Sequence, residues 1–135
     1  IGACSEFCGA QHAWMRINVV AQTQIDFNNW LAANVSNGIT PTDTIAVTGK
    51  KLFEEKTCGN CHRIQGTEAN AIVGPDLTHI GSRQEILTGM MENNVSNLYK
   101  WINNPQEIKP GAHMPDFQFE RDSVIAIAHY LSQLK

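Results

Sequence analysis

The apolar positions near the end of the chain recur at the spacing of an α-helix. They are Val124, Ile127, Ala128, Leu131 and Leu134. Side chains three or four residues apart lie on one helix face, so this segment predicts a helix that buries one side. A second helix is expected from Thr42 or Asp43, either of which can cap it, to about Lys56. Its apolar residues on or near one side are Val47, Leu52 and Phe53.

Gly49 lies in the middle of this second helix, where glycine costs about 1 kcal/mol relative to alanine. That cost predicts a close approach to the backbone by a bulky residue, for which Tyr130 is the candidate. Residues 96–103 predict a further short helix, which Pro105 stops. A strand pattern is absent after residue 43, so the larger part of the chain is expected to be all-helical.

The first third of the chain has a different pattern. Residues 14–22 (WMRINVVAQ) place large apolar side chains on alternating faces, which predicts a strand, and residues 26–33 predict a short helix. Residues 34–42 have little to bury and are rich in Asn, Thr and Gly, which is typical of a linker. We therefore expect an N-terminal unit over residues 1–33 and a second domain over residues 43–135.

Composition is that of an ordinary globular protein, with 42% hydrophobic and 17% charged residues in a chain of 135. Ten Lys and Arg stand against thirteen Asp and Glu, which argues against a nucleic-acid partner. The longest strongly apolar run, residues 124–128, is far shorter than the roughly 18 residues of a membrane span.

The pentapeptide CGNCH at residues 58–62 is the densest cluster of candidate chemistry. A zinc site usually needs a second pair of cysteines at matching spacing, and a thioredoxin-like redox pair needs a βαβ context. A disulfide leaves His62 without a role. Covalent haem uses all three residues, because the thiols of Cys58 and Cys61 add to the vinyl groups and His62 becomes the proximal iron ligand.

A second axial ligand is expected from Met114, which lies between Pro110 and Pro115 in the segment KPGAHMP. Met90 and Met91 are in or next to a helical pattern, where methionine usually fills a core. His79 and His113 can also bind iron, but an exposed or hydrogen-bonded side chain is the favoured interpretation of both.

Residues 43–135 resemble a class I cytochrome c domain. The resemblance rests on CGNCH, GPDL at 74–77, WINNP at 101–105 and KPGAHMP at 109–115. It implies a helical fold around a covalent haem c.

That resemblance also assigns roles to single residues. It places His62 and Met114 on the iron, and it makes the Pro75 carbonyl the hydrogen-bond acceptor of the His62 imidazole. It further places Trp101 near the haem propionates; charge alone makes Arg83 a further candidate there. Iron with both axial positions filled by protein is suited to carrying electrons rather than to binding oxygen.

The N-terminal segment CSEFCGAQHAWM carries a second set of soft donors. Cys4, Cys8, His12 and Met15 are ligand types that select copper, while a disulfide or two free thiols remain the alternative. The segment resembles the ligand loop of the dinuclear copper (CuA) domain in cytochrome c oxidase subunit II, which adds the Glu6 carbonyl as a ligand. The family needs a further histidine from an upstream strand, so the copper site is expected to be incomplete in these residues.

By this resemblance, residues 14–33 are the terminal strand and helix of a cupredoxin-like barrel. The order of copper loop, linker and cytochrome c resembles the C-terminal portion of subunit II in caa3-type oxidases. It implies that the haem passes electrons from an upstream respiratory donor, such as a bc complex or a cytochrome c, to CuA and oxidase subunit I. The expected location is the outer face of the bacterial cytoplasmic membrane, held there by preceding helices. The alternatives are a free-standing cytochrome c with an unrelated extension, and a haem sensor or peroxidase with a displaceable sixth ligand.

Overall fold

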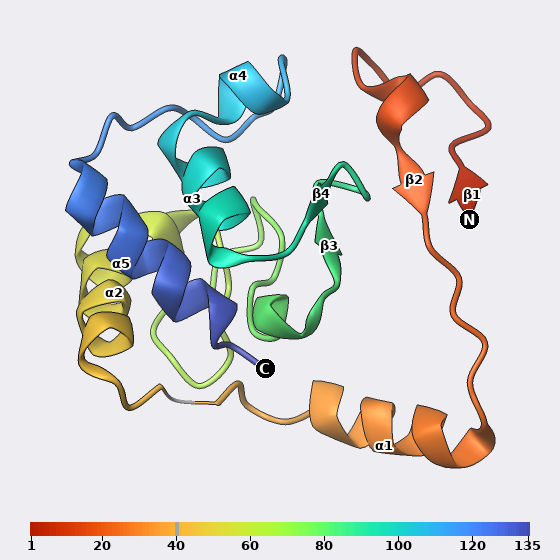
Figure 1. Cartoon of the computed structure of the whole chain (residues 1–135), viewed down its shortest axis with the longest axis horizontal. Coiled ribbons are helices and arrows are strands. Elements are labelled where there is room, and N and C mark those ends of the chain that lie inside the picture. Colours follow the sequence, from red (N-terminus) through yellow and green to blue (C-terminus); the bar gives the residue numbers. More distant parts are fainter. Residues whose placement is uncertain (40) are drawn as a thin grey trace.

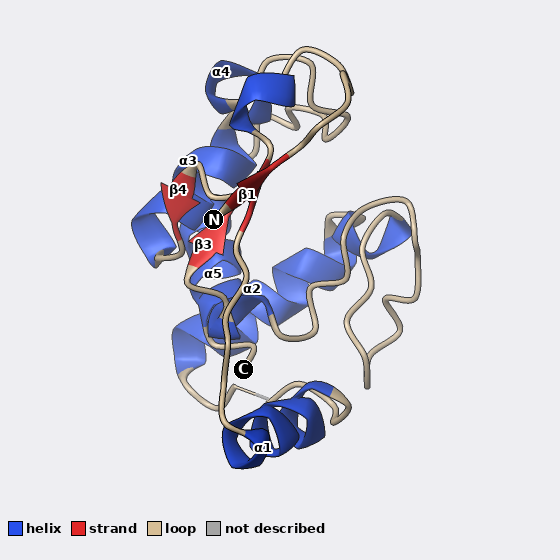
Figure 2. Cartoon of the chain, turned by 90° about the vertical axis from the view of Figure 1, so that its right-hand side faces the viewer, coloured by secondary structure: helices blue, strands red, loops and turns tan. Residues whose placement is uncertain are grey.

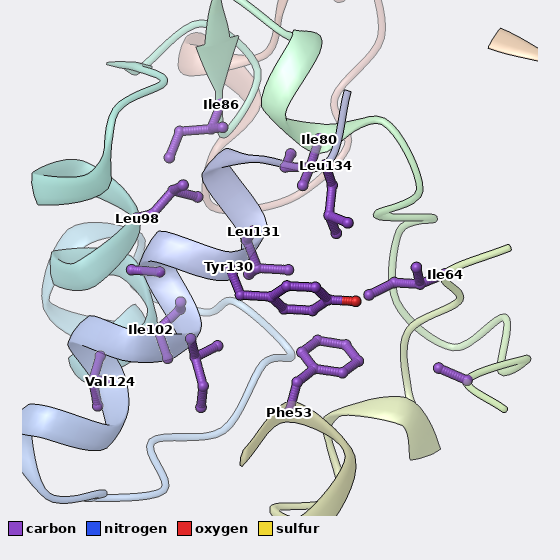
Figure 3. Close-up of a cluster of buried hydrophobic side chains, with 13 residues drawn as sticks. Phe53, Ile64, Ile80, Ile86, Leu98, Ile102, Val124, Tyr130, Leu131 and Leu134 are labelled. Atoms are coloured by element: carbon purple, nitrogen blue, oxygen red, sulfur yellow. The ribbon is translucent and has the colours of Figure 1, made fainter. Parts of the chain in front are cut away.

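Three helices build the core of a computed structural model that describes residues 1–39 and 41–135; Thr40 of the expected linker lies outside the described residues. They are α2 (Thr44–Glu55), α3 (Val95–Asn103) and α5 (Arg121–Ser132). Helix α5 packs against both α2 and α3 (Figure 1). Figure 3 shows Tyr130 of α5 beside Phe53 of α2, with Leu98 and Ile102 of α3 in the same cluster. The predicted mainly helical fold is confirmed.

Helix α2 begins where the sequence predicts, because the Asp43 carboxylate accepts hydrogen bonds from the backbone N–H groups of Ile45 and Ala46 at 3.1 and 3.0 Å. The same carboxylate also accepts from the side chains of His129 and Gln133 on and just after α5. Asp43 therefore caps one helix and ties it to another.

Gly49 lies at the crossing of α2 and α5, as predicted. A Cβ at this position would stand 2.0 Å from the Ala126 carbonyl oxygen and 2.8 Å from the Tyr130 Cβ. A side chain at Gly49 would therefore force one of the two helices to shift. Phe53 is buried and Leu52 half-buried, whereas Val47, expected on or near the same side of the helix, has 52% of its surface exposed.

One expectation about the second domain needs correction, and one is confirmed with an addition. Strands do occur after residue 43, because β3 (Glu85–Ile86) pairs antiparallel with β4 (Met91–Glu92). With two residues each, these strands are too short to show an alternating pattern. Pro105 does more than end α3: it is the first residue of α4 (Pro105–Ile108), where its missing N–H costs nothing.

The N-terminal unit is less regular than predicted. Strand β2 (Arg16–Ile17) covers two of the nine residues expected, and it pairs with β1 (Gly2–Ala3); Val19 and Val20 are exposed. The predicted helix is confirmed as α1 (Gln24–Asn34), which begins two residues earlier because Thr23 caps it. Helix α1 lies at the opposite end of the molecule from α4 (Figure 1, Figure 2).

In the described ranges 1–39 and 41–135, every helix is too short or too polar to cross a bilayer.

Candidate metal centres

The two cysteines of CGNCH lie on a tight turn directly after α2. The 3-10 helix Cys58–Asn60 closes this turn, and the N–H groups of Cys61 and His62 both donate to the Cys58 carbonyl at 3.2 and 3.0 Å. Both thiols are free and half-buried. Cys58 packs against the core, and burial raises the pKa of its thiol.

The imidazole of His62 is held by the next loop. Its Nδ1 lies 2.8 Å from the Pro75 carbonyl oxygen. Because a carbonyl can only accept, Nδ1 carries the proton and donates, which leaves the Nε2 lone pair free for a metal. The contact predicted for Pro75 is therefore present in the structure.

Gly74 fixes the same imidazole from the side, and our sequence reasoning assigned it no role. A Cβ on Gly74 would stand 2.6 Å from His62 Cε1 and 2.8 Å from Nδ1. Only glycine lets the loop come this close to the ring. Its place directly before Pro75 in the GPDL motif is the signal that points to this role.

Met114 is half-buried and packs against the same core as Cys58 and Trp101. Its loop is held by Gln106, another residue that sequence reasoning missed. The Gln106 side chain donates to the carbonyls of Ala112 and Met114 at 2.7 and 3.0 Å and accepts from the Gly111 N–H at 3.2 Å. A glutamine on a four-residue helix gives no sequence signal for this, because its partners lie along the loop.

The other candidate ligands lie elsewhere. His79 Nε2 lies 3.0 Å from the Ser36 carbonyl, and His113 is exposed, in line with the favoured interpretation of both. Met91 belongs to β4 and Met90 to the turn before it, so the expected helical setting of these two methionines is wrong. Arg83 is exposed and lines an open polar cavity with Trp30 and Asp76.

These donors fit a covalent haem. Two free thiols stand one turn apart, an imidazole presents Nε2, and a thioether comes from a separate loop over the same core. Several large apolar side chains on the outside of this core are only partly buried, which is the surface that a flat apolar porphyrin would cover.

The second set of donors also converges. One ligand atom from each of Cys4, Cys8 and His12 lies within 4.8 Å of the others. The Cys8 Sγ is 3.6 Å from His12 Nδ1 and 3.5 Å from the Met15 Sδ, and the Cys4 Sγ donates to the Glu6 carbonyl at 3.1 Å. Two thiols and an imidazole therefore converge, with a thioether beside Cys8 and a carbonyl beside Cys4, and this donor set fits copper.

The thiols of this loop influence each other. A hydrogen bond with Cys4 raises the pKa of the Cys8 thiol, desolvation adds to the rise, and the positive charge of Lys109 opposes it. Lys109 belongs to the loop that leads to Met114.

The chain belongs to the cytochrome c family, whose model matches residues 46–135. Beyond the family, three curated relatives described as cytochrome c oxidase subunit 2 are similar to 99% of the chain. The relative from Alkalihalophilus pseudofirmus is 36% identical, and those from Bacillus subtilis and Bacillus sp. strain PS3 are 30% and 32% identical. The chain spans 39% of the length of each. The resemblance of residues 43–135 to a cytochrome c domain and the resemblance of the chain to cytochrome c oxidase subunit II are both confirmed.

Proposed function

We propose that this chain carries one covalent haem c and relays electrons within a respiratory haem-copper oxidase. Cys58 and Cys61 would hold the haem, and His62 and Met114 would supply the two protein ligands of its iron. The observation that carries the proposal is the hydrogen bond from His62 Nδ1 to Pro75, which leaves the Nε2 lone pair free to bind a metal. When bound, the haem supplies one-electron chemistry.

The chain's own residues set the conditions for that chemistry. Pro75 and Gly74 fix the ring of His62, and Gln106 braces the Met114 loop, so that both side chains would be held in place as iron ligands in competition with oxygen or peroxide. Trp101 belongs near the propionates in this proposal.

The N-terminal loop is proposed to hold CuA in the complete protein, where Cys4 and Cys8 would supply thiolate ligands. His12, Met15 and the Glu6 carbonyl complete the set that these residues supply. The convergence of the donor atoms supports this part. Residues 1–33 are then the end of a cupredoxin-like domain, residues 34–42 a linker, and residues 43–135 the cytochrome c domain.

In this proposal the chain accepts electrons from an upstream respiratory donor, such as a bc complex or a cytochrome c, and delivers them to CuA and oxidase subunit I. This electron transfer takes place on the outer face of the cytoplasmic membrane, and membrane helices elsewhere in the complete protein provide the anchor. The linker keeps donor and acceptor in one molecule, so a high effective concentration replaces free diffusion.

Optical spectra of the oxidised and reduced protein test the axial assignment. The native protein should show a sulfur-to-iron charge-transfer band that Met114→Ala removes and the matched control Met90→Ala keeps. A native spectrum without the band, or a Met114→Ala spectrum with it, contradicts the assignment. Carbon monoxide binding to the reduced native protein at neutral pH would instead favour a sensor or peroxidase.

A further inference from the structure

The copper loop and the Met114 loop are in direct contact, although 99 residues separate the two partners of the bond between them. The side-chain Nε2 of Gln11 donates to the Pro110 carbonyl at 2.8 Å. A Cβ on Gly111 would stand 3.8 Å from that of Ala10, which is ordinary van der Waals contact. Figure 1 shows the N-terminal loop reaching the end of the molecule where α4 and the following loop lie.

A second contact holds the end of the copper loop and the segment after it against the β3–β4 hairpin. The Arg16 N–H donates to the Thr88 carbonyl at 3.3 Å, and the Thr88 hydroxyl donates to the Trp14 carbonyl at 3.2 Å. Asn18 donates to the carboxylate of Glu85 in β3. Together the two contacts fix both the position and the orientation of the copper loop on the second domain. One contact alone would let the loop rotate about it.

The hydrogen bond from Gln11 to Pro110 lies close to the candidate ligands of both centres. Gln11 is the neighbour of His12, whose imidazole belongs to the copper set. Pro110 is followed by Gly111, whose N–H is bound by Gln106, and Gln106 also binds the Met114 carbonyl. One side-chain hydrogen bond therefore joins the copper loop to a loop that is itself cross-braced to Met114.

We propose that residues 9–12 dock on residues 109–111 as the electron-transfer interface between the cytochrome c domain and the copper site. This inference rests on the proposed function of both centres. One electron leaves the site at His62 and Met114, which is oxidised, and reaches the site at Cys4 and Cys8, which is reduced. No atom or proton has to move with it.

A disulfide between residues 10 and 111 tests the docking in the full-length protein loaded with haem and copper. The 3.8 Å separation of the two Cβ positions is the mean for disulfides, about 3.8 Å. We expect Ala10→Cys with Gly111→Cys to cross-link on mild oxidation in more than half of the molecules. The matched control is Ala10→Cys with Gly66→Cys, because Gly66 has the same left-handed backbone as Gly111, with φ of 84° against 81°. Peptide mapping by mass spectrometry identifies the cross-link, and metal ligation protects the four native thiols.

The haem and copper spectra of the unaltered protein are recorded first, so that failure of the proposed function appears as a missing spectrum. If both spectra are present and the 10–111 cross-link is no more frequent than in the control, the docking is wrong. The cross-linked protein should also transfer electrons from haem to copper after flash reduction within about twofold of the parental rate. A slowing of tenfold or more would overturn the interface, because the locked arrangement would then be unable to transfer.

Gln11→Ala gives a second, milder variant. It removes the bond to Pro110, so we expect transfer at least twofold slower with both reduction potentials unchanged. Gln24→Ala, which removes an exposed hydrogen bond to Asn28 within α1, should leave the rate unchanged. Equal rates in the two variants would contradict the proposed path.

Discussion

Replacing Gly74 by alanine should raise the reduction potential of the bound haem. The new Cβ would stand 2.6 Å from His62 Cε1, and ordinary contact begins at 3.4 Å, so the ring has to retreat by about 0.8 Å. The His62 Nδ1 to Pro75 bond is 2.8 Å long, and a retreat of this size stretches it to about 3.6 Å, beyond hydrogen-bond length.

The largest shift in reduction potential that the loss of this hydrogen bond can cause follows from its free energy. A neutral hydrogen bond contributes about 0.5–1.5 kcal/mol net. A tenfold change in equilibrium corresponds to about 1.4 kcal/mol, or about 59 mV for one electron. If the bond acts on only one oxidation state, the shift is therefore about 20–60 mV. Its sign is positive, because the donated proton makes His62 a stronger electron donor and so stabilises ferric iron.

Spectroelectrochemical titration measures the potential, and the proton resonance of His62 Nδ1 reports the bond itself. Glu68→Ala, an exposed change in the preceding loop, is the control and should shift neither. An unchanged potential in Gly74→Ala together with loss of the proton resonance would refute the link between this bond and the potential. If both stay unchanged, the close approach of Gly74 to the ring is wrong.

Three further predictions concern the frame around the site. Gly49→Ala should lower the free energy of unfolding by about 1–3 kcal/mol, because its Cβ would meet the Ala126 carbonyl at 2.0 Å; an unchanged thermal midpoint contradicts this. The pKa of Asp43 is lowered mainly by a backbone N–H of α2, so its stabilisation is present above the ordinary carboxyl pKa and is lost as pH falls through the lowered one. In urea titrations, the free energy of unfolding should therefore fall more steeply between pH 5 and pH 2 in the native protein than in Asp43→Asn. Parallel plots of this free energy against pH would contradict the prediction. Gln106→Ala frees the Met114 loop from hydrogen bonds of about 1 kcal/mol each, so imidazole should displace the thioether at roughly tenfold lower concentration, as followed by the charge-transfer band.

The helical core could be predicted because its signals are local. Asp43 is a strong capping residue directly before an apolar face, and the α5 repeat is regular enough to define its buried side. Gly49 is informative for a different reason: a costly residue in a helix predicts a close neighbour. Both kinds of evidence lie within a few residues of the element concerned.

What escaped prediction depends on partners far along the chain. Two-residue strands carry no periodicity, and the strand expected over residues 14–22 is short because only β1 pairs with it among the described residues. Gln106 is polar and near the surface, and only the folded loop gives it a role. The approach of Gln11 to Pro110 joins residues 99 positions apart, for which a single sequence offers no sign.

The central claim is one haem bonded to Cys58 and Cys61, and the mass of the intact coloured chain tests it most directly. Protein matured in a host that attaches haem should be heavier than the bare chain by one haem. The colour should stay with the protein in acidified organic solvent and be lost when both cysteines are replaced by alanine. A chain of unmodified mass, or pigment that passes into the solvent, would contradict covalent attachment and the electron-transfer function built on it.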